Sequence, residues 1–267
     1  MCQNLLPHSP RPTAGPTAPR ISGIVARMTD SPSSGPQQDM DLRILSVGGS
    51  PGPDERSMNV VIQTTRGDIT GILHPVEGGT GAVVCVGGAM GGVKGPANSL
   101  YERLPALLEE AKATVLRVEY RKPNDFEECV LDALAGCSFL KGIGATDIVL
   151  VGHSFGGAVV IRAGELFPLV TGVVSMSPQL HGTRQVENLG KPLLLVHGMS
   201  DTILDHEASE DIYRRAREPK RIVLYAEAGH SLIQAADQID ALLQAWIPAR
   251  LMDQAMEGGR EEHETSS

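Results

Sequence analysis

Residues 147–167, DIVLVGHSFGGAVVIRAGELF, are the stretch from which the rest of the chain can be interpreted. The apolar run at 148–151 is typical of a buried strand, and apolar residues at helical spacing resume at Ala158. Between them stands GHSFG at 152–156, which predicts a sharp strand-to-helix turn with Ser154 at its tip. Such a turn would hold the serine hydroxyl at one end of a sheet.

The pattern G-x-S-x-G is weak evidence by itself, because it occurs twice in the chain. Residues 48–52, GGSPG, also match it, but Pro53, Asp54 and Glu55 follow instead of an apolar helix. A proline- and glycine-rich stretch of this kind predicts a loop. Ser154 is the candidate nucleophile because of its surroundings.

The apolar pattern outward from this turn predicts an α/β fold. Strands 59–64 and 68–74 form a hairpin, and strand 82–86 is a continuous apolar run of the kind found in parallel sheets. Helices and strands then alternate: helix 97–111, strand 114–118, helix 125–140, strand 147–151, the helix after Ser154, strand 170–175, strand 193–197, helix 207–217, strand 221–225 and helix 232–252. This order predicts a mostly parallel sheet with helices on both faces and antiparallel N-terminal strands.

The ends of the chain differ in composition from the centre. Residues 1–56 are rich in Pro, Ser and Gly and are predicted to be a disordered extension, followed by one domain at 57–254 and a disordered acidic tail at 255–267. No secretory signal pattern is present, so a cytoplasmic location is expected. The first 29 residues contain three arginines and no acidic residue, which leaves an organelle transit peptide as the alternative.

Composition excludes several classes of protein. A net charge of −9, without a block of lysine or arginine, argues against a nucleic acid as partner. No apolar run reaches the roughly 20 residues that span a bilayer, so no membrane span is expected. The four cysteines lack the spacing of a metal site, so a zinc site is not expected. The oligomeric state cannot be read from the sequence.

A serine hydroxyl needs a base and an orienting acid, and the ends of parallel strands are where they should lie. His230 follows strand 221–225 and Asp201 follows strand 193–197. Asp205 is the alternative acid, but its place before helix 207–217 suits a helix cap. The other candidate bases are His74, His153, His181, His197 and His206.

These motifs together resemble the α/β-hydrolase-fold serine hydrolases, over about residues 58–252. They are the GHSFG turn, the H-G-x-x-D loop ending in Asp201, the Gly-His loop at His230 and the glycine-rich turn at 87–92. The resemblance implies that Ser154 is the nucleophile, His230 the general base and then acid, and Asp201 the carboxylate that orients it. No metal or cofactor is implied.

The resemblance also implies an oxyanion hole and an open pocket. Backbone amides of Phe155 and of Ala89, or alternatively Met90, would hold the oxyanion. Only residues 176–192 separate strands 170–175 and 193–197, which is too short for a cap domain. The expected relatives are therefore lidless esterases and proteins like dienelactone hydrolase. Residues 179–184 are favoured as a solvated loop, and the alternative is that they edge the pocket, with Arg184 contacting a substrate carboxylate.

The expected function is hydrolysis of an ester or thioester of a small or medium acyl group through an acyl-serine intermediate. The expected partner is a small-molecule substrate. Peptidase, perhydrolase and acyltransferase activities use the same triad and remain alternatives, as does a binding protein without turnover. A rival interpretation makes the turn at 87–92 a dinucleotide site with Glu119 on a ribose, but its second glycine falls on Ala89 and Ser154 is left unexplained.

Overall fold

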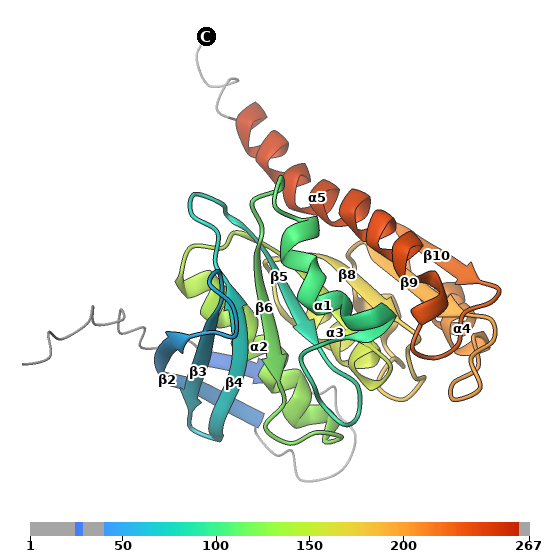
Figure 1. Ribbon diagram of the computed structural model, residues 1–267, viewed down its shortest axis with the longest axis horizontal. Helices are drawn as coiled ribbons and strands as arrows, with labels where there is room; N and C mark the ends of the chain where they lie inside the picture. The colour runs from blue at the N-terminus through green and yellow to red at the C-terminus, as the bar shows by residue number, and fades with distance from the viewer. Residues whose placement is uncertain (1–24, 29–39, 262–267) are drawn as a thin grey trace, which may run out of the picture.

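A single twisted sheet, mostly parallel, runs through the centre of the protein (Figure 1). The structure is a computed structural model, and it describes residues 25–28 and 40–261. The strand order is β1-β2-β3-β4-β6-β5-β7-β8-β9-β10. Strands β1 to β4 pair antiparallel, and so do β4 and β6, whereas every pair from β6 to β10 is parallel.

The strands are β1 (Val25–Met28), β2 (Met40–Pro51), β3 (Met58–Thr64), β4 (Gly67–His74), β5 (Gly81–Val86), β6 (Thr114–Glu119), β7 (Asp147–His153), β8 (Val170–Met176), β9 (Leu193–Gly198) and β10 (Lys220–Tyr225). The helices are α1 (Pro96–Leu107), α2 (Phe126–Gly142), α3 (Phe155–Leu166), α4 (Glu207–Arg215) and α5 (Ala236–Glu261), with short 3-10 helices η1 (Val186–Asn188) and η2 (Ile233–Ala235).

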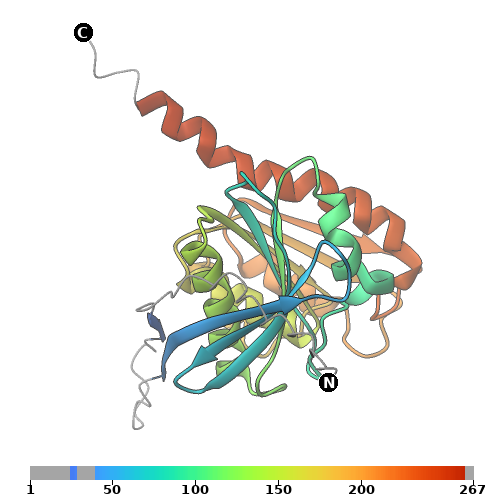
Figure 2. The same ribbon diagram turned by 60° about the vertical axis from the view of Figure 1, so that its left-hand side comes forward.

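Helices cover both faces of the sheet, as the turned view shows (Figure 2). Because side chains alternate along a strand, β5 contributes to two cores at once. Val84 and Val86 face one core together with α2 and α3, whereas Val83 and Cys85 face the other together with α1 and α5. This double burial explains why the parallel strands are continuous apolar runs.

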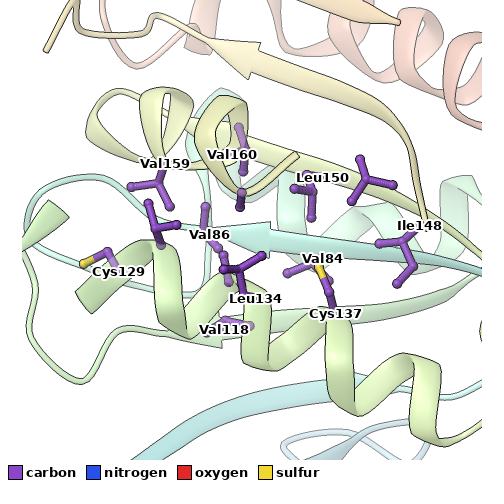
Figure 3. Packing of buried hydrophobic residues seen from close by; sticks show 14 of the residues in the cluster. Val84, Val86, Val118, Cys129, Leu134, Cys137, Ile148, Leu150, Val159 and Val160 are labelled. Atoms are coloured by element: carbon purple, nitrogen blue, oxygen red, sulfur yellow. The ribbon is translucent and has the colours of Figure 1, made fainter. Parts of the chain in front are cut away.

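The first core joins the centre of the sheet to α2 and α3 (Figure 3). Figure 3 shows Val84 of β5 and Leu150 of β7 in one cluster with Leu134 of α2 and Val160 of α3. All four side chains are buried. Dense packing of this kind fixes the carboxyl ends of β5 and β7, from which the candidate site is built.

The predicted fold class is confirmed, with a mostly parallel sheet, helices on both faces and antiparallel strands at the N-terminal side. Between β8 and β9 the chain forms only the three-residue helix η1, so no cap domain is inserted there. The predicted parallel strands agree with the observed ones to within two residues at each end.

The prediction that residues 1–56 are disordered is wrong for residues 25–28 and 40–56. Strand β2 pairs along β3, and β1 pairs with β2. Leu42 and Ile44 of β2 are buried in the first core, which holds the strand to the sheet. The GGSPG stretch at 48–52, predicted to be a loop, instead continues β2 as far as Pro51 by backbone pairing with β3. Residues 1–24 and 29–39 lie outside the described part of the chain.

The predicted disordered tail at 255–267 is also corrected in part, since α5 continues to Glu261. Residues 253–257, DQAME, are mostly good helix formers, so the helix continues past Leu251, the last residue of α5 in the second core. Residues 262–267 lie outside the described residues.

Candidate active site

Ser154 lies on a sharp turn between β7 and α3, as the sequence predicts. Its backbone has φ 58° and ψ −120°, a conformation that L-residues rarely adopt and that is often found at functional sites. Two glycines make the turn possible through close packing. A Cβ on Gly152 would collide with the carbonyl oxygen of Gly156, and a Cβ on Gly156 would collide with that of Gly87. The turn therefore packs directly against the glycine-rich loop.

The structure brings together the three residues predicted from strand order. His230 Nε2 lies 3.0 Å from Ser154 Oγ, and His230 Nδ1 lies 2.7 Å from Asp201 Oδ2. Ser154 follows β7, Asp201 follows β9 and His230 follows β10, so all three stand at the carboxyl edge of the parallel sheet. The side chain of His230 is 20% exposed and that of Asp201 is fully buried. This geometry allows a proton to pass from the serine hydroxyl to the imidazole.

The carboxylate of Asp201 is held by its own loop. Its Oδ1 accepts the backbone amides of Ile203 at 2.8 Å and Leu204 at 2.9 Å. Burial by itself would raise the pKa of Asp201, but the hydrogen bonds from Leu204, His230 and Ile203 together hold that pKa below its usual value. Asp201 is therefore an anion facing His230 in the neutral pH range.

The alternative acid, Asp205, does not contact His230. Its Oδ1 accepts the backbone amide of Glu207 at 3.0 Å, at the first turn of α4. The N-cap residue of α4 is His206, so Asp205 stands one residue before the predicted cap position, although its carboxylate does bind an amide at the start of the helix. Asp201 is the carboxylate of the three-residue arrangement.

Two other histidines lie beside this arrangement, and sequence reasoning missed their contacts. The sequence alone suggests that His153 points away from its neighbour's chemistry, yet its ring centroid is 4.9 Å from that of His230. His153 Nε2 donates to the carbonyl oxygen of His230 at 2.9 Å, and burial lowers the pKa of His153 to about 4. His197 is buried against Asp201 Oδ2 at 3.1 Å. The feature of the sequence that could have indicated these contacts is the position of both histidines at the end of a parallel strand.

The remaining candidate bases lie elsewhere. His74 pairs with Asp54 at 3.3 Å, His206 lies 3.2 Å from Asp205, and the ring of His181 packs edge-on against Phe126.

The glycine-rich loop forms a tight turn beside the serine. The amide of Gly91 donates to the carbonyl oxygen of Gly88 at 2.9 Å, which makes Ala89 and Met90 the two central residues of the turn. A Cβ built on Gly88 would lie 3.7 Å from Ser154 Cβ. Phe155 begins α3, and the first amides of a helix have no partner within it. Free amide donors at Phe155 and a turn next to Ser154 are the elements that an oxyanion hole requires.

The rival interpretation of this loop as a dinucleotide site is not supported by its contacts. Glu119, the predicted ribose acid, instead accepts the amide of Gly92 at 2.9 Å. Its carboxylate is thus used to hold the loop.

A groove opens next to Phe155. Its volume is about 560 Å³, and it is lined by Asn124, Asp125, Phe126, Glu127, Phe155, Gln179 and His181. The ring of Phe126 packs edge-on against Phe155, with centroids 6.0 Å apart. The amide of Gln179 donates to the carbonyl oxygen of Ser154 at 3.4 Å, which fixes the groove beside the serine. Gln179 and His181 line this groove, which agrees with the less favoured interpretation of the segment, whereas Arg184 is not part of the lining.

Among the described residues, no three His, Cys, Asp or Glu side chains are grouped so that they could hold a metal ion. Within the same residues, no helix combines the length and the apolar character needed to cross a membrane.

Sequence comparison connects this arrangement to known proteins. Residues 181–237 match the family model described as serine aminopeptidase, S33, a segment that contains Asp201 and His230. The uncharacterized protein YfhR of Escherichia coli K12 is 26% identical over 132 residues, which are 46% of this chain and 45% of YfhR. The chain thus matches about half the length of its curated relatives.

Solved structures show the same fold over most of the chain. Est1E from Butyrivibrio proteoclasticus has a TM-score of 0.61 and 16% identity, and the match covers 70% of this chain and 96% of Est1E. A dienelactone hydrolase from Anabaena variabilis has a TM-score of 0.62 at 18% identity, with 72% and 97% covered. An α/β serine hydrolase without a lid from Xanthomonas campestris has a TM-score of 0.59 and 19% identity, and the match covers 75% of this chain and 97% of that protein. The protein has the α/β-hydrolase fold, in its lidless form.

Proposed function

We propose that the protein is a serine hydrolase that cleaves an ester or thioester of a small or medium acyl group. The observation that carries this proposal is the unbroken chain from Ser154 Oγ to His230 Nε2 at 3.0 Å and from His230 Nδ1 to Asp201 Oδ2 at 2.7 Å. A binding role gives no reason for a serine, a histidine and a carboxylate to line up in this way.

In the proposed mechanism, Ser154 Oγ attacks the acyl carbonyl carbon while His230 Nε2 takes the hydroxyl proton. The oxyanion of the tetrahedral intermediate accepts hydrogen bonds from the amide of Phe155 and that of Ala89 or Met90. The proton then passes from His230 to the leaving alcohol or thiol, and an acyl-serine remains. A water molecule, deprotonated by His230, attacks this ester, and His230 returns the proton to Ser154 Oγ as the bond to the acyl group breaks and the acid leaves. Asp201 stabilises the imidazolium of His230 during both acylation and deacylation.

The groove beside Phe155 is our candidate for the part of the substrate that lies next to the reacting carbonyl. Its volume of about 560 Å³ lies within the range of small-molecule sites and accommodates more than an acetyl group. Phe126 and Phe155 provide apolar ring surface, while Gln179 and Asn124 offer amides. Among the described residues no lid separates the groove from solvent, which favours small substrates or acyl groups that are presented by a larger molecule.

A fluorophosphonate probe tests the nucleophile directly, because it forms a covalent bond with an activated serine. The native protein should be labelled, and Ser154→Ala should abolish labelling. Ser50→Ala is the matched control, because Ser50 lies in the second G-x-S-x-G sequence but on strand β2, and it should leave labelling intact. Labelling that persists in Ser154→Ala would contradict the assignment, and folded native protein that is never labelled would favour a binding role.

An aminopeptidase activity is the second candidate. It is supported by the description of the matching family model and by two acidic residues, Asp125 and Glu127, in the groove, where a substrate ammonium group could bind. The two activities can be distinguished by comparing the hydrolysis of chromogenic aminoacyl anilides with that of simple esters that release the same class of chromophore. Faster turnover of the anilides, expressed as kcat/KM, would replace the esterase proposal by this one.

A further inference from the structure

His197 is the last residue of β9 that carries a side chain, and it contacts the same oxygen of Asp201 as His230 does. Its ring is fully buried. Nε2 lies 3.1 Å from Asp201 Oδ2 and 3.0 Å from the carbonyl oxygen of Leu204. Nδ1 lies 2.7 Å from Ser209 Oγ on α4, whose side chain is also buried. The ring therefore links α4 to the loop that carries Asp201.

These contacts determine which ring nitrogen carries the proton. Both partners of Nε2 are acceptors, a carboxylate and a carbonyl oxygen, so Nε2 must be protonated. Burial lowers the pKa of His197, which keeps the ring neutral and leaves Nδ1 as an acceptor. Ser209 Oγ must then donate to Nδ1. In the series Ser209, His197, Asp201, the donor and the acceptor of each hydrogen bond are therefore defined.

The same oxygen of Asp201 receives both imidazoles. Oδ2 accepts from His230 Nδ1 and from His197 Nε2, while Oδ1 accepts the two loop amides. All the lone pairs of this fully buried carboxylate are thus used. If His197 were absent, Oδ2 would keep His230 as its single partner among the described contacts, and the orientation of the carboxylate would depend on that bond and on the two loop amides at Oδ1.

We propose that His197 is a positioning residue: through Nε2 it fixes the rotation of the Asp201 carboxylate so that Oδ2 faces His230, and Ser209 fixes its tautomer. This inference rests on the proposed catalytic role of Asp201. His197 does not touch the substrate. Its effect should therefore fall on kcat and leave KM unchanged.

The competing explanation is that His197 only stabilises the fold by binding the carbonyl oxygen of Leu204 and the hydroxyl of Ser209. Two amide variants distinguish these explanations. The side-chain nitrogen of glutamine reaches about as far as Nε2, so His197→Gln keeps a donor for Asp201. The side chain of asparagine reaches only as far as Nδ1, so His197→Asn keeps a partner for Ser209 and loses the donor for Asp201.

Both variants should be assayed for kcat and KM on a chromogenic ester and for the thermal midpoint. We expect His197→Asn to lose on the order of tenfold or more in kcat, which corresponds to one hydrogen bond to a charged group, with KM unchanged. We expect His197→Gln to stay within about threefold of the native kcat, because the donor to the charged group is retained. Equal kcat values in the two variants, whatever their thermal midpoints, would overturn the proposal.

A second measurement does not depend on turnover. The proton on His230 Nδ1 donates to a buried carboxylate, so its NMR resonance should lie far downfield in the native protein. It should persist in His197→Gln and be lost or broadened in His197→Asn. Native protein that shows the resonance but hydrolyses neither esters nor anilides would contradict the proposed function and leave the positioning role standing. A resonance that is unchanged in His197→Asn would contradict the positioning role.

Discussion

At the scale of single residues, His153 is a largely buried histidine that contacts the candidate site through the backbone of His230. Its Nε2 donates to the carbonyl oxygen of His230 at 2.9 Å, and burial lowers its pKa from 6.5 to about 4. The unfolded chain therefore takes up a proton at this residue between pH 6.5 and 4, while the folded protein does not. The contribution of neutral His153 to the free energy of unfolding is complete above pH 6.5 and should be lost as the pH falls toward 4.

We expect this loss to be about 2 kcal/mol at pH 4, somewhat less than the full shift implies, since part of the His153 residue remains exposed. Urea unfolding of native protein and His153→Gln between pH 7.5 and 4.5 measures it, because glutamine keeps a donor and does not titrate. The stability of the native protein should fall more steeply with acid than that of the variant. Parallel pH profiles would show that His153 does not contribute.

Which site residues can be predicted from the sequence depends on the kind of contact. Ser154, Asp201 and His230 each follow a parallel strand, so the order of the strands is enough to predict that they meet at one edge. The contacts of His153 and His197 depend on side-chain direction, which strand order does not determine. The same limit applies to Ala89 and Met90, because the sequence does not fix which amide of a four-residue turn faces the serine.

At the scale of elements, α2 begins at a cluster of charges that ties three segments together. Glu128, in its first turn, accepts Arg121 at 2.8 Å and Lys122 at 3.1 Å, both from the chain after β6, and also accepts Arg66 from the β3–β4 turn. The hydrogen bond from Arg66, joined by those from its other partners, lowers the pKa of this buried carboxyl to about 2 despite burial. The cluster joins α2 to the hairpin and to β6.

Glu128→Gln should therefore destabilise the protein by about 2 to 3 kcal/mol at neutral pH. Because the pKa of Glu128 is lower in the folded protein than its ordinary 4.5, the stabilisation is complete above that pH and is lost as the pH falls toward 2. The stability difference between native protein and variant should shrink in that window. Glu127→Gln, an exposed neighbour in the same turn, is the control and should change stability by less than about 0.5 kcal/mol. Equal effects of the two changes would contradict the role of the cluster.

The elements that the sequence predicts best are those that are buried on both faces. Strands β5 and β7 each contain a continuous apolar run, so their positions follow from composition, although β7 continues for two residues beyond its run, to His153. The sequence does not predict strand β2, because Leu42 and Ile44 are its two buried apolar side chains and Val47 packs on the same core only in part. The second half of the strand, through Gly48 and Gly49, is held by backbone pairing with β3. Backbone hydrogen bonds leave no signature in side-chain type, so such a strand cannot be read from its residues.

At the scale of the whole molecule, the sheet has an antiparallel side that does not carry the candidate site. β2 lies along β3 at that side and contributes Leu42 and Ile44 to the core that α2 and α3 share. Without β2, the backbone of β3 would become a free sheet edge and part of this core would be exposed to water. The segment 40–51 is therefore expected to be part of the folding unit, although residue 57 is where the sequence alone places the start of the domain.

A chain that starts at Met58 should be less stable than one that starts at Met40. Loss of the two buried aliphatic side chains predicts a decrease of about 3 to 6 kcal/mol in the free energy of unfolding, before the lost pairing with β3 is counted. Urea unfolding of the two chains measures this, with Leu42→Ala in the longer chain as an intermediate. The full chain is measured beside the chain from Met40 as a reference for its free energy of unfolding. Equal midpoints for the chains from Met40 and Met58 would mean that β2 lies on the sheet without stabilising it. Because Ser154, Asp201 and His230 lie beyond β5 on the parallel side, a Met58 chain that still folds should keep its rate of fluorophosphonate labelling.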